Sequence, residues 1–434
     1  MEAVTLLSLS MLILFVFLAM HQHVGAALGL TAMLLLYFFV GKSMPLLAII
    51  GPWDTLNNFD FIALPGYILT GNIIMHSGLG MSIYQGAAPW VSRLPGGLLN
   101  TNIIACSIFA AISGSSAATA ATIGAVAIPE QTKLGYDRKF LLGTLAGAGT
   151  LGLLIPPSIS FIVYAALTGV SVGHLFIAGV IPGIILATMF LIYTIIQSIR
   201  NPQLIPRSDA HPTKKELVQS IRFLWPALLL IGGIMAFIFF GIATVIEVSA
   251  IGVVAALIIA AIERKLSWKV IVDSFNDSIR TLCLMNFVVI GALVLQFCWG
   301  NLMIPRKIAI AMSQTGLPLW GILILIYVFY LFLGCLFDGV SMMILTLPVV
   351  YPLITAYNLD PIWFGVVLTV LIEIAQITPP IGFNLYVLSG IARCPISEVV
   401  AGSFPFFCLL LAGLTLFTIF PDICTWLPRH MLGK

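Results

Sequence analysis

Small hydroxyl residues form a dense polar group inside an otherwise apolar stretch of the chain. The segment Ser113-Gly114-Ser115-Ser116 lies in the middle of the apolar run Leu98–Ile128. Glycine permits a tight turn, and serine caps a following helix whose first N–H groups and dipole favour a carboxylate. Carbonyl oxygens at the opposite end of a half-helix suit Na⁺. The segment therefore predicts a carboxylate and cation site at a hairpin tip, against the plainer alternative of small-residue helix packing.

Two proline pairs, Pro156-Pro157 and Pro379-Pro380, lie 223 residues apart, each within a long apolar segment. A proline inside a helix removes a backbone donor and clashes with the preceding turn. In a membrane, such a break persists only where the freed backbone is buried in protein or lines a cavity. Two breaks at matching points of two halves are the best sequence indication of a transporter's binding site.

Each break carries polar groups of its own. Before the first break, Gly152–Ile155 would offer unpaired carbonyls, and Ser160 follows it as a donor for an anion. The second break offers the Thr378 hydroxyl and the Asn384 amide. The alternative at both places is a kinked helix that holds no ligand.

Two carboxylates lie within predicted membrane segments, where ionisable groups are costly and indicate function. Asp338 falls at the tip of a second hairpin and would bind Na⁺, a substrate hydroxyl or an ammonium group, or else cap the following helix. Glu373, in the second broken segment, would line the cavity or pair with a base elsewhere, and the sequence does not decide between these.

The composition is that of an integral membrane protein. Of 434 residues, 60% are hydrophobic and only 8% are charged, whereas soluble domains carry about 25% charged residues. The net charge of +3 and the lack of a dense basic patch outside the membrane-flanking loops argue against a nucleic-acid partner. No P-loop or catalytic motif is present, so we expect no enzyme and an ion gradient instead of ATP as the energy source.

An internal repeat relates the two halves. A shift of 223 residues without gaps aligns Pro129 with Pro352 and Asp137 with Asp360, as well as the two proline pairs. Each half has the order hairpin, broken helix, Gly-x-x-Pro helix, which predicts duplication. The expected parts are scaffold helices at 1–60, repeat 1 at 61–199 (hairpin about 92–128, broken helix 138–168), two scaffold helices between cytoplasmic loops at 200–280, repeat 2 at 281–420 (hairpin about 317–352, broken helix 361–391) and a tail at 421–434.

Loop charges predict the orientation, because basic loops stay in the cytoplasm. The stretches Arg200–Arg222 and Glu263–Arg280 are the richest in Lys and Arg and are placed inside. The two repeats then have opposite orientation, and the C-terminus lies outside. Arg306 and Lys307 fall outside in this topology, against the rule.

At these motifs the chain resembles the large membrane subunit of TRAP (tripartite ATP-independent periplasmic) transporters. The resemblance covers nearly the whole chain and is carried by Ile112–Gly124, Leu154–Ser158, Phe337–Gly339 and Thr378–Gly382. It implies an all-α polytopic membrane protein with inverted repeats, two re-entrant hairpins and two broken helices, working as an elevator-type transporter in the bacterial inner membrane. It also implies Na⁺-coupled uptake of an organic acid from a periplasmic binding protein, and a separate small membrane subunit of about four helices.

The resemblance also assigns residues. Sodium is expected at one site formed by Ser113, Ser116, Gly152 and Pro156, and at a second formed by Gly334, Asp338, Gly339, Thr378 and Pro379. Substrate contacts are expected from Ser115, Ser116, Ser160, Asp338 and Asn384. A stand-alone symporter for divalent anions is the alternative. C4-dicarboxylates, sialic acids, other sugar acids and sulfonates all stay open as substrates.

Overall fold

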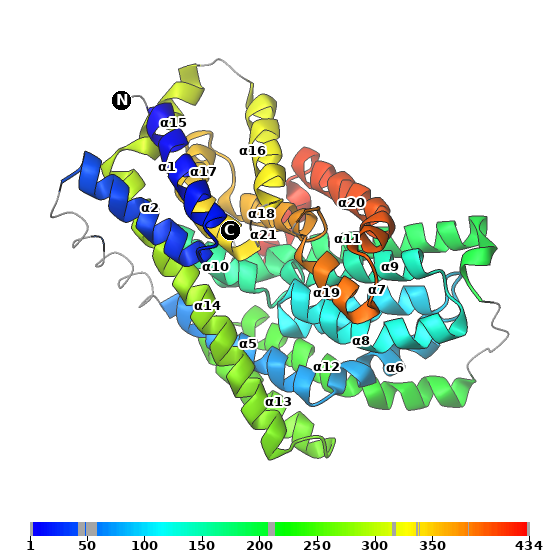
Figure 1. The fold of residues 1–434 in the computed structure, drawn as a ribbon. Coiled ribbons are helices and arrows are strands. Elements are labelled where there is room, and N and C mark those ends of the chain that lie inside the picture. The colour runs from blue at the N-terminus through cyan, green and yellow to red at the C-terminus, as the bar shows by residue number, and fades with distance from the viewer. Residues whose placement is uncertain are drawn as a thin grey trace.

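Every regular element in the described part of the chain is a helix, which confirms the all-α class (Figure 1). The structure is a computed structural model, and it describes residues 3–41, 48, 59–206, 213–314, 318–335, 337, 339–380 and 382–431. Six of these helices are long and apolar enough to cross a membrane: α11 (Val172–Arg200), α12 (Lys214–Phe239), α13 (Val245–Ile262), α14 (Trp268–Asn301), α17 (Gly339–Ala356) and α20 (Ile396–Ile419). The chain is therefore a multi-pass membrane protein.

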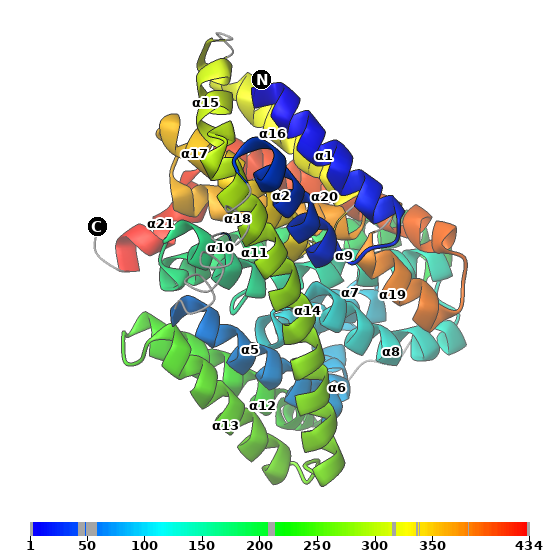
Figure 2. The ribbon, with the colours of Figure 1, turned by 60° about the vertical axis from the view of Figure 1, so that its left-hand side comes forward.

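A first group of helices packs around the long helix α14, which crosses the whole molecule in Figure 2. It contacts α2 (Val24–Phe39) and α5 (Phe59–His76), while α1 (Ala3–Ala19) packs on α2 and α13 packs on α5. Glycine permits the α2–α14 crossing, because a Cβ on Gly25 would lie 2.5 Å from the Phe287 carbonyl oxygen. We call α1, α2, α5, α12, α13 and α14 the frame helices.

Two helical hairpins and two broken helices form the second group. The first hairpin is α7 (Leu98–Ser113) and α8 (Ser116–Leu134), followed by the broken helix α9 (Arg138–Thr150), η1 (Leu151–Leu153) and α10 (Ile159–Thr168). The second hairpin is α16 (Leu319–Gly334) and α17, followed by α18 (Pro361–Gln376) and α19 (Phe383–Ala392). A long helix, α11 or α20, closes each half. Each half of the chain thus has the order hairpin, broken helix, long helix.

The two repeats interlock. The arm α19 of the second repeat packs on α8 of the first, α20 packs on α9, and α10 packs on α17. A Cβ on either Gly143 of α9 or Gly402 of α20 would collide with the backbone of the other helix. The hairpins and broken helices therefore form one body, which we call the repeat body.

Several segments differ from the sequence expectation. Helix α14 begins at Trp268, where a loop up to Arg280 was expected, and α12 begins at Lys214, within the other expected loop. The Ser267 side chain accepts a hydrogen bond from the Val270 N–H, and Thr213 forms a capping box with Glu216, so polar caps extend both helices beyond their apolar cores. Three amphipathic or short helices were not expected: α6 (Leu79–Val91), α15 (Ile304–Gln314) and α21 (Asp422–Met431). Arg306 and Lys307 lie exposed on α15.

Candidate functional site

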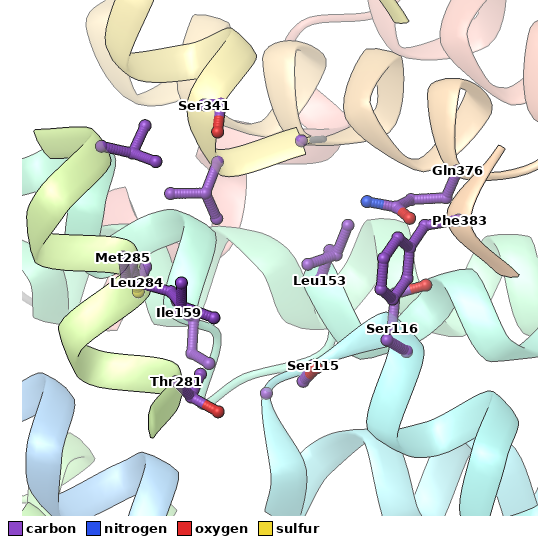
Figure 3. Close-up of a pocket in the computed structure, with 15 residues that line it drawn as sticks. Ser115, Ser116, Leu153, Ile159, Thr281, Leu284, Met285, Ser341, Gln376 and Phe383 are labelled. Atoms are coloured by element: carbon purple, nitrogen blue, oxygen red, sulfur yellow. The ribbon is translucent and has the colours of Figure 1, made fainter. Parts of the chain in front are cut away.

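A cavity of about 340 Å³ lies where the first hairpin tip, the second hairpin and α14 meet (Figure 3). Ser116, Phe383 and Gln376 lie together on one side of it, and Thr281, Leu284 and Met285 of α14 face them from the other side. The described lining residues are Gly114, Ser115, Ser116, Ala117, Leu153, Ile159, Thr281, Leu284, Met285, Val288, Gly339, Val340, Ser341, Gln376 and Phe383.

Four helices of the repeat body begin at this cavity. Helices α8, α10, α17 and α19 each line it with residues of their first turn: Ser116 and Ala117, Ile159, Gly339 to Ser341, and Phe383. The first turn of a helix has N–H groups without intrahelical acceptors and carries the positive end of the helix dipole. Four such ends around one cavity favour an anion.

No basic side chain lines the cavity among the described residues, and the sequence places none in the surrounding segments. Lys and Arg are absent from 94–132, 140–199, 281–305 and 308–392. These ranges contain both hairpin tips, both breaks and the part of α14 that faces them. An anion bound there would have to be stabilised by helix ends and hydroxyl groups, because no basic side chain is among the described lining residues.

The first hairpin tip gathers oxygen atoms. The Ser113 Oγ lies 2.9 Å from the Thr119 Oγ1, which donates to the Ser115 carbonyl at 2.8 Å. Gly152 of the first break lies against this group, since a Cβ there would be 2.7 Å from the Ser115 carbonyl oxygen. Of the four residues expected to bind Na⁺ here, the structure thus brings Ser113 and Gly152 to the Ser115 carbonyl, and the binding of Na⁺ stays a prediction. Oxygen donors suit a hard cation such as Na⁺, so the residues fit the predicted ion.

Ser116 and Asn384 meet each other, although 268 positions separate them. The Asn384 amide donates to the Ser116 Oγ at 2.7 Å, and the Ser116 hydroxyl lies 3.0 Å from the Asn384 Oδ1. Asn384 is fully buried and is not among the lining residues, whereas Ser116 is 2% exposed and reaches the cavity. In this conformation the Asn384 side chain ties α19 to α8, and its predicted contact with substrate stays a prediction.

Pro156 and Ser160, the other predicted residues near the first break, are not among the described lining residues of the cavity. Pro156 is buried, and Ser160 is fully buried in the first turn of α10 with a hydroxyl that has no hydrogen-bond partner among the described residues. The Ile159 N–H donates to the Gly114 carbonyl at 3.4 Å, which holds the start of α10 against the hairpin tip. Ser115 and Ser116 line the cavity, whereas Ser160 is not among its described lining residues, and their predicted contacts with substrate stay predictions.

The second predicted cation site is described in part. Gly339 packs against Ile372 and Gln376, and Gly334 packs against Ala375, so the second hairpin tip lies on the last turn of α18. The Thr378 hydroxyl donates to the Ile374 carbonyl at 2.6 Å, and Pro379 follows it at the break. Asp338 lies outside the described residues, and its roles stay predictions.

Glu373 is fully buried in α18, and neither carboxylate oxygen has a hydrogen-bond partner in the described part of the chain. It neither lines the cavity nor joins one of the ion pairs of the described residues. Among the described residues, Glu373 therefore neither lines the cavity nor pairs with a base, which were the two alternatives that the sequence left open. The position aligned with it in the first repeat is Thr150, whose hydroxyl bonds locally to the Gly147 carbonyl.

The sequence did not single out three groups that the structure places at the site. Thr119 completes the oxygen cluster. Its position four residues after Ser115, on the same helix face, is the sequence signal that could have identified it. Gln376 lines the cavity one turn after Glu373, with an Oε1 that has no partner among the described residues. The wall formed by Thr281, Leu284 and Met285 had no signal, because only tertiary packing brings α14 to the hairpin tips.

These features define a class: a membrane transporter built of two inverted repeats, with discontinuous helices meeting at a central site. The family described as "Tripartite ATP-independent periplasmic transporter, DctM component" matches residues 11–423, and the chain belongs to this family. It is a transporter component and not an enzyme.

Similar proteins agree with this assignment. The chain is 31% identical over 410 residues to the C4-dicarboxylate TRAP transporter large permease protein DctM of Pseudomonas aeruginosa, covering 93% of this chain and 94% of that protein. It is 29% identical to the sialic acid TRAP transporter large permease protein SiaM of Vibrio cholerae, covering 87% and 88%. The fold is similar to the crystal structure of the Alcanivorax borkumensis YdaH transporter, with a TM-score of 0.65, 16% identity and coverage of 92% and 91%.

Proposed function

We propose that this chain is the large permease subunit of a Na⁺-coupled system that takes up an organic acid. A periplasmic binding protein would deliver the acid, and a separate small membrane subunit of about four helices would complete the frame. The family description as tripartite supports this form over a stand-alone symporter. We place the chain in the bacterial inner membrane with its C-terminus on the periplasmic side, from the charges of its loops.

The observation that carries the proposal is that four helices begin at a cavity whose described lining residues include no basic side chain. The carboxylate would accept hydrogen bonds from N–H groups in these first turns and from the Ser115 hydroxyl. Na⁺ would lie in the oxygen cluster of Ser113, Ser115 and Thr119, next to Gly152. Its charge would offset that of the carboxylate across the short width of the hairpin tip, which couples the two ligands.

An elevator movement accounts for the division of the molecule. The cavity lies at the boundary between the repeat body and α14, so one wall belongs to each part. The contacts inside the repeat body, such as Ser116–Asn384, would travel with the substrate. The wall on α14 would stay with the frame helices, and displacement of the repeat body past it would open the site to the other side.

Reconstitution tests the proposal. The chain would be inserted into liposomes with its small subunit, a matching binding protein would be added, and uptake would be scored with and without an inward Na⁺ gradient. We expect uptake that requires both the gradient and the binding protein. Uptake without the binding protein would instead establish the stand-alone symporter, and uptake unaffected by Na⁺ would reject the coupling.

A further inference from the structure

The cavity wall has an apolar character that the dicarboxylate and sialic acid names of the relatives do not explain. Its described side chains include Leu153, Ile159, Leu284, Met285, Val288, Val340 and Phe383. This wall is apolar, and its described residues include no Lys or Arg. From these two observations we propose that the cavity takes a monocarboxylate with an apolar body. This inference rests on the proposed function and assigns a substrate class to the same site.

The charge balance limits the substrate to one carboxylate. The helix starts that line this cavity of about 340 Å³ supply partial charges only, and no Lys or Arg exists in the surrounding segments to add a full charge for a second carboxylate. A second carboxylate farther from the hairpin tip would lie against apolar side chains such as Met285, which is half-buried. Burying a charge against apolar groups without a partner carries a large penalty. A dicarboxylate is therefore disfavoured.

The small number of polar side chains in the lining limits how many hydroxyl groups of a substrate can form hydrogen bonds there. The lining hydroxyls are those of Ser115, Ser116, Thr281 and Ser341, and Ser116 is already bonded to Asn384. A polyhydroxylated acid leaves most of its groups without partners in such a cavity. The apolar body instead gains from contact with α14, whose Met285 adapts to different shapes.

One buried polar group at the cavity indicates that a small polar function beside the carboxylate is accepted. Gln376 is 9% exposed, lines the cavity, and has an Oε1 without a hydrogen-bond partner among the described residues. A buried amide oxygen without a partner is costly, so a ligand group that donates to it is favoured. Gln376 lies beside Phe383 in Figure 3, on the same side as Ser116.

Direct binding to the full chain tests this proposal, because uptake would also report the selectivity of the binding protein. The chain would be placed in lipid nanodiscs at constant Na⁺, and calorimetry would measure Kd for acetate, propanoate, butanoate, pentanoate and hexanoate. Each buried methylene should tighten binding about fourfold until the cavity is full. Adipate has the same six carbons as hexanoate but carries a carboxylate in place of the terminal methyl group, and we expect it to bind at least tenfold more weakly. Hexanamide, without the charge, should bind more weakly than hexanoate.

Variants on α14 distinguish binding of the acid in the cavity from its partition into the lipid. Met285→Ala should weaken hexanoate about three- to tenfold and leave acetate unchanged, because only the longer chain reaches this wall. Ile290→Ala is the matched control, since Ile290 is 39% exposed and does not line the cavity. An equal effect of the two variants on hexanoate would overturn the assignment of the wall.

The outcomes distinguish this inference from the proposed function. Binding of adipate, succinate or N-acetylneuraminate as tight as that of hexanoate overturns the substrate class and leaves organic-acid uptake standing. If the acids bind but the Kd does not change from acetate to hexanoate, the substrate class is likewise overturned, and organic-acid uptake still stands. Failure of every acid to bind with Na⁺ present rejects the proposed function and the inference together.

Discussion

The turn of the first hairpin depends on Gly114, and replacing it tests how closely the tip must approach the first break. Gly114 ends α7 in the left-handed region, with φ at 59°. Gly169 ends α10 in the same region, with φ at 75°. The surroundings differ: a Cβ on Gly114 would lie 2.8 Å from the Pro157 carbonyl oxygen, whereas a Cβ on Gly169 would meet nothing within 4 Å. Gly169→Ala is therefore a matched control for Gly114→Ala.

The expected magnitudes follow from these two terms. An alanine in the left-handed region costs about 1–2 kcal/mol, and both variants lose this amount. Overpacking adds about 1–3 kcal/mol at Gly114 alone, because the atoms that it meets belong to backbone and cannot rotate away. Gly114→Ala should thus lower the free energy of unfolding by about 2–5 kcal/mol. The hairpin tip should also move away from the first break. This movement would disrupt the oxygen cluster and the hydrogen bond from the Ile159 N–H to the Gly114 carbonyl.

Thermal unfolding in lipid nanodiscs and uptake in liposomes measure the two effects. A chain of this length loses about 1 °C of Tm per kcal/mol, so the variants should differ by about 1–3 °C. Uptake should be lost in Gly114→Ala and kept in Gly169→Ala, at equal amounts of inserted protein. Equal Tm shifts with equal uptake would refute the close approach of the tip to the break as a requirement.

Four further substitutions test other parts of the site. Thr119→Val keeps the shape but removes a cluster oxygen, so the Na⁺ concentration for half-maximal uptake should rise about tenfold; an unchanged Na⁺ dependence would remove Thr119 from the cation site. Ser116→Ala and Asn384→Leu should each lower stability by about 1–3 kcal/mol, and the double variant by less than the sum, because each single change leaves a buried partner without a hydrogen bond. Additive shifts in Tm would contradict the tie between α8 and α19. Glu373→Met should raise Tm, because burying a carboxylate without a partner is costly; uptake by the same stabilised variant then reports whether transport requires the carboxylate.

The breaks and hairpins could be predicted from the sequence because local rules govern them. Two adjacent prolines interrupt a helix, whereas single prolines such as Pro129 and Pro182 lie within helices here. Glycine permits the tip at Gly114, and serine caps the next arm. The extended start of α14 was missed because hydropathy detects the apolar core of a helix, whereas the Ser267 cap lies in a polar stretch. The amphipathic α21 was missed for the same reason.

The composition of the site was harder to predict because it depends on distant contacts. Ser113, Ser115 and Ser116 could be assigned to one tip because they are neighbours in sequence. The pairing of Ser116 with Asn384 joins two repeats, and no local pattern records it. The wall on α14 comes from a helix outside the hairpins, whose Met285 has the same hydropathy as a lipid-facing residue. Side chains that face a ligand and those that face lipid are alike when the ligand is apolar.

The described lining of the cavity contains no basic side chain, which has a consequence for the proposed coupling. An arginine at the site would attract a carboxylate whether or not Na⁺ were bound, and the anion could then cross without the ion. Here the helix starts provide only partial charges, of about half an elementary charge each at most. If Na⁺ binds in the oxygen cluster as proposed, its full positive charge would raise the affinity for the carboxylate at the same tip. By linkage, the carboxylate would raise the affinity for Na⁺ by the same factor. A site built from helix ends and hydroxyl groups would therefore favour joint occupancy, which is the condition for using an ion gradient without loss.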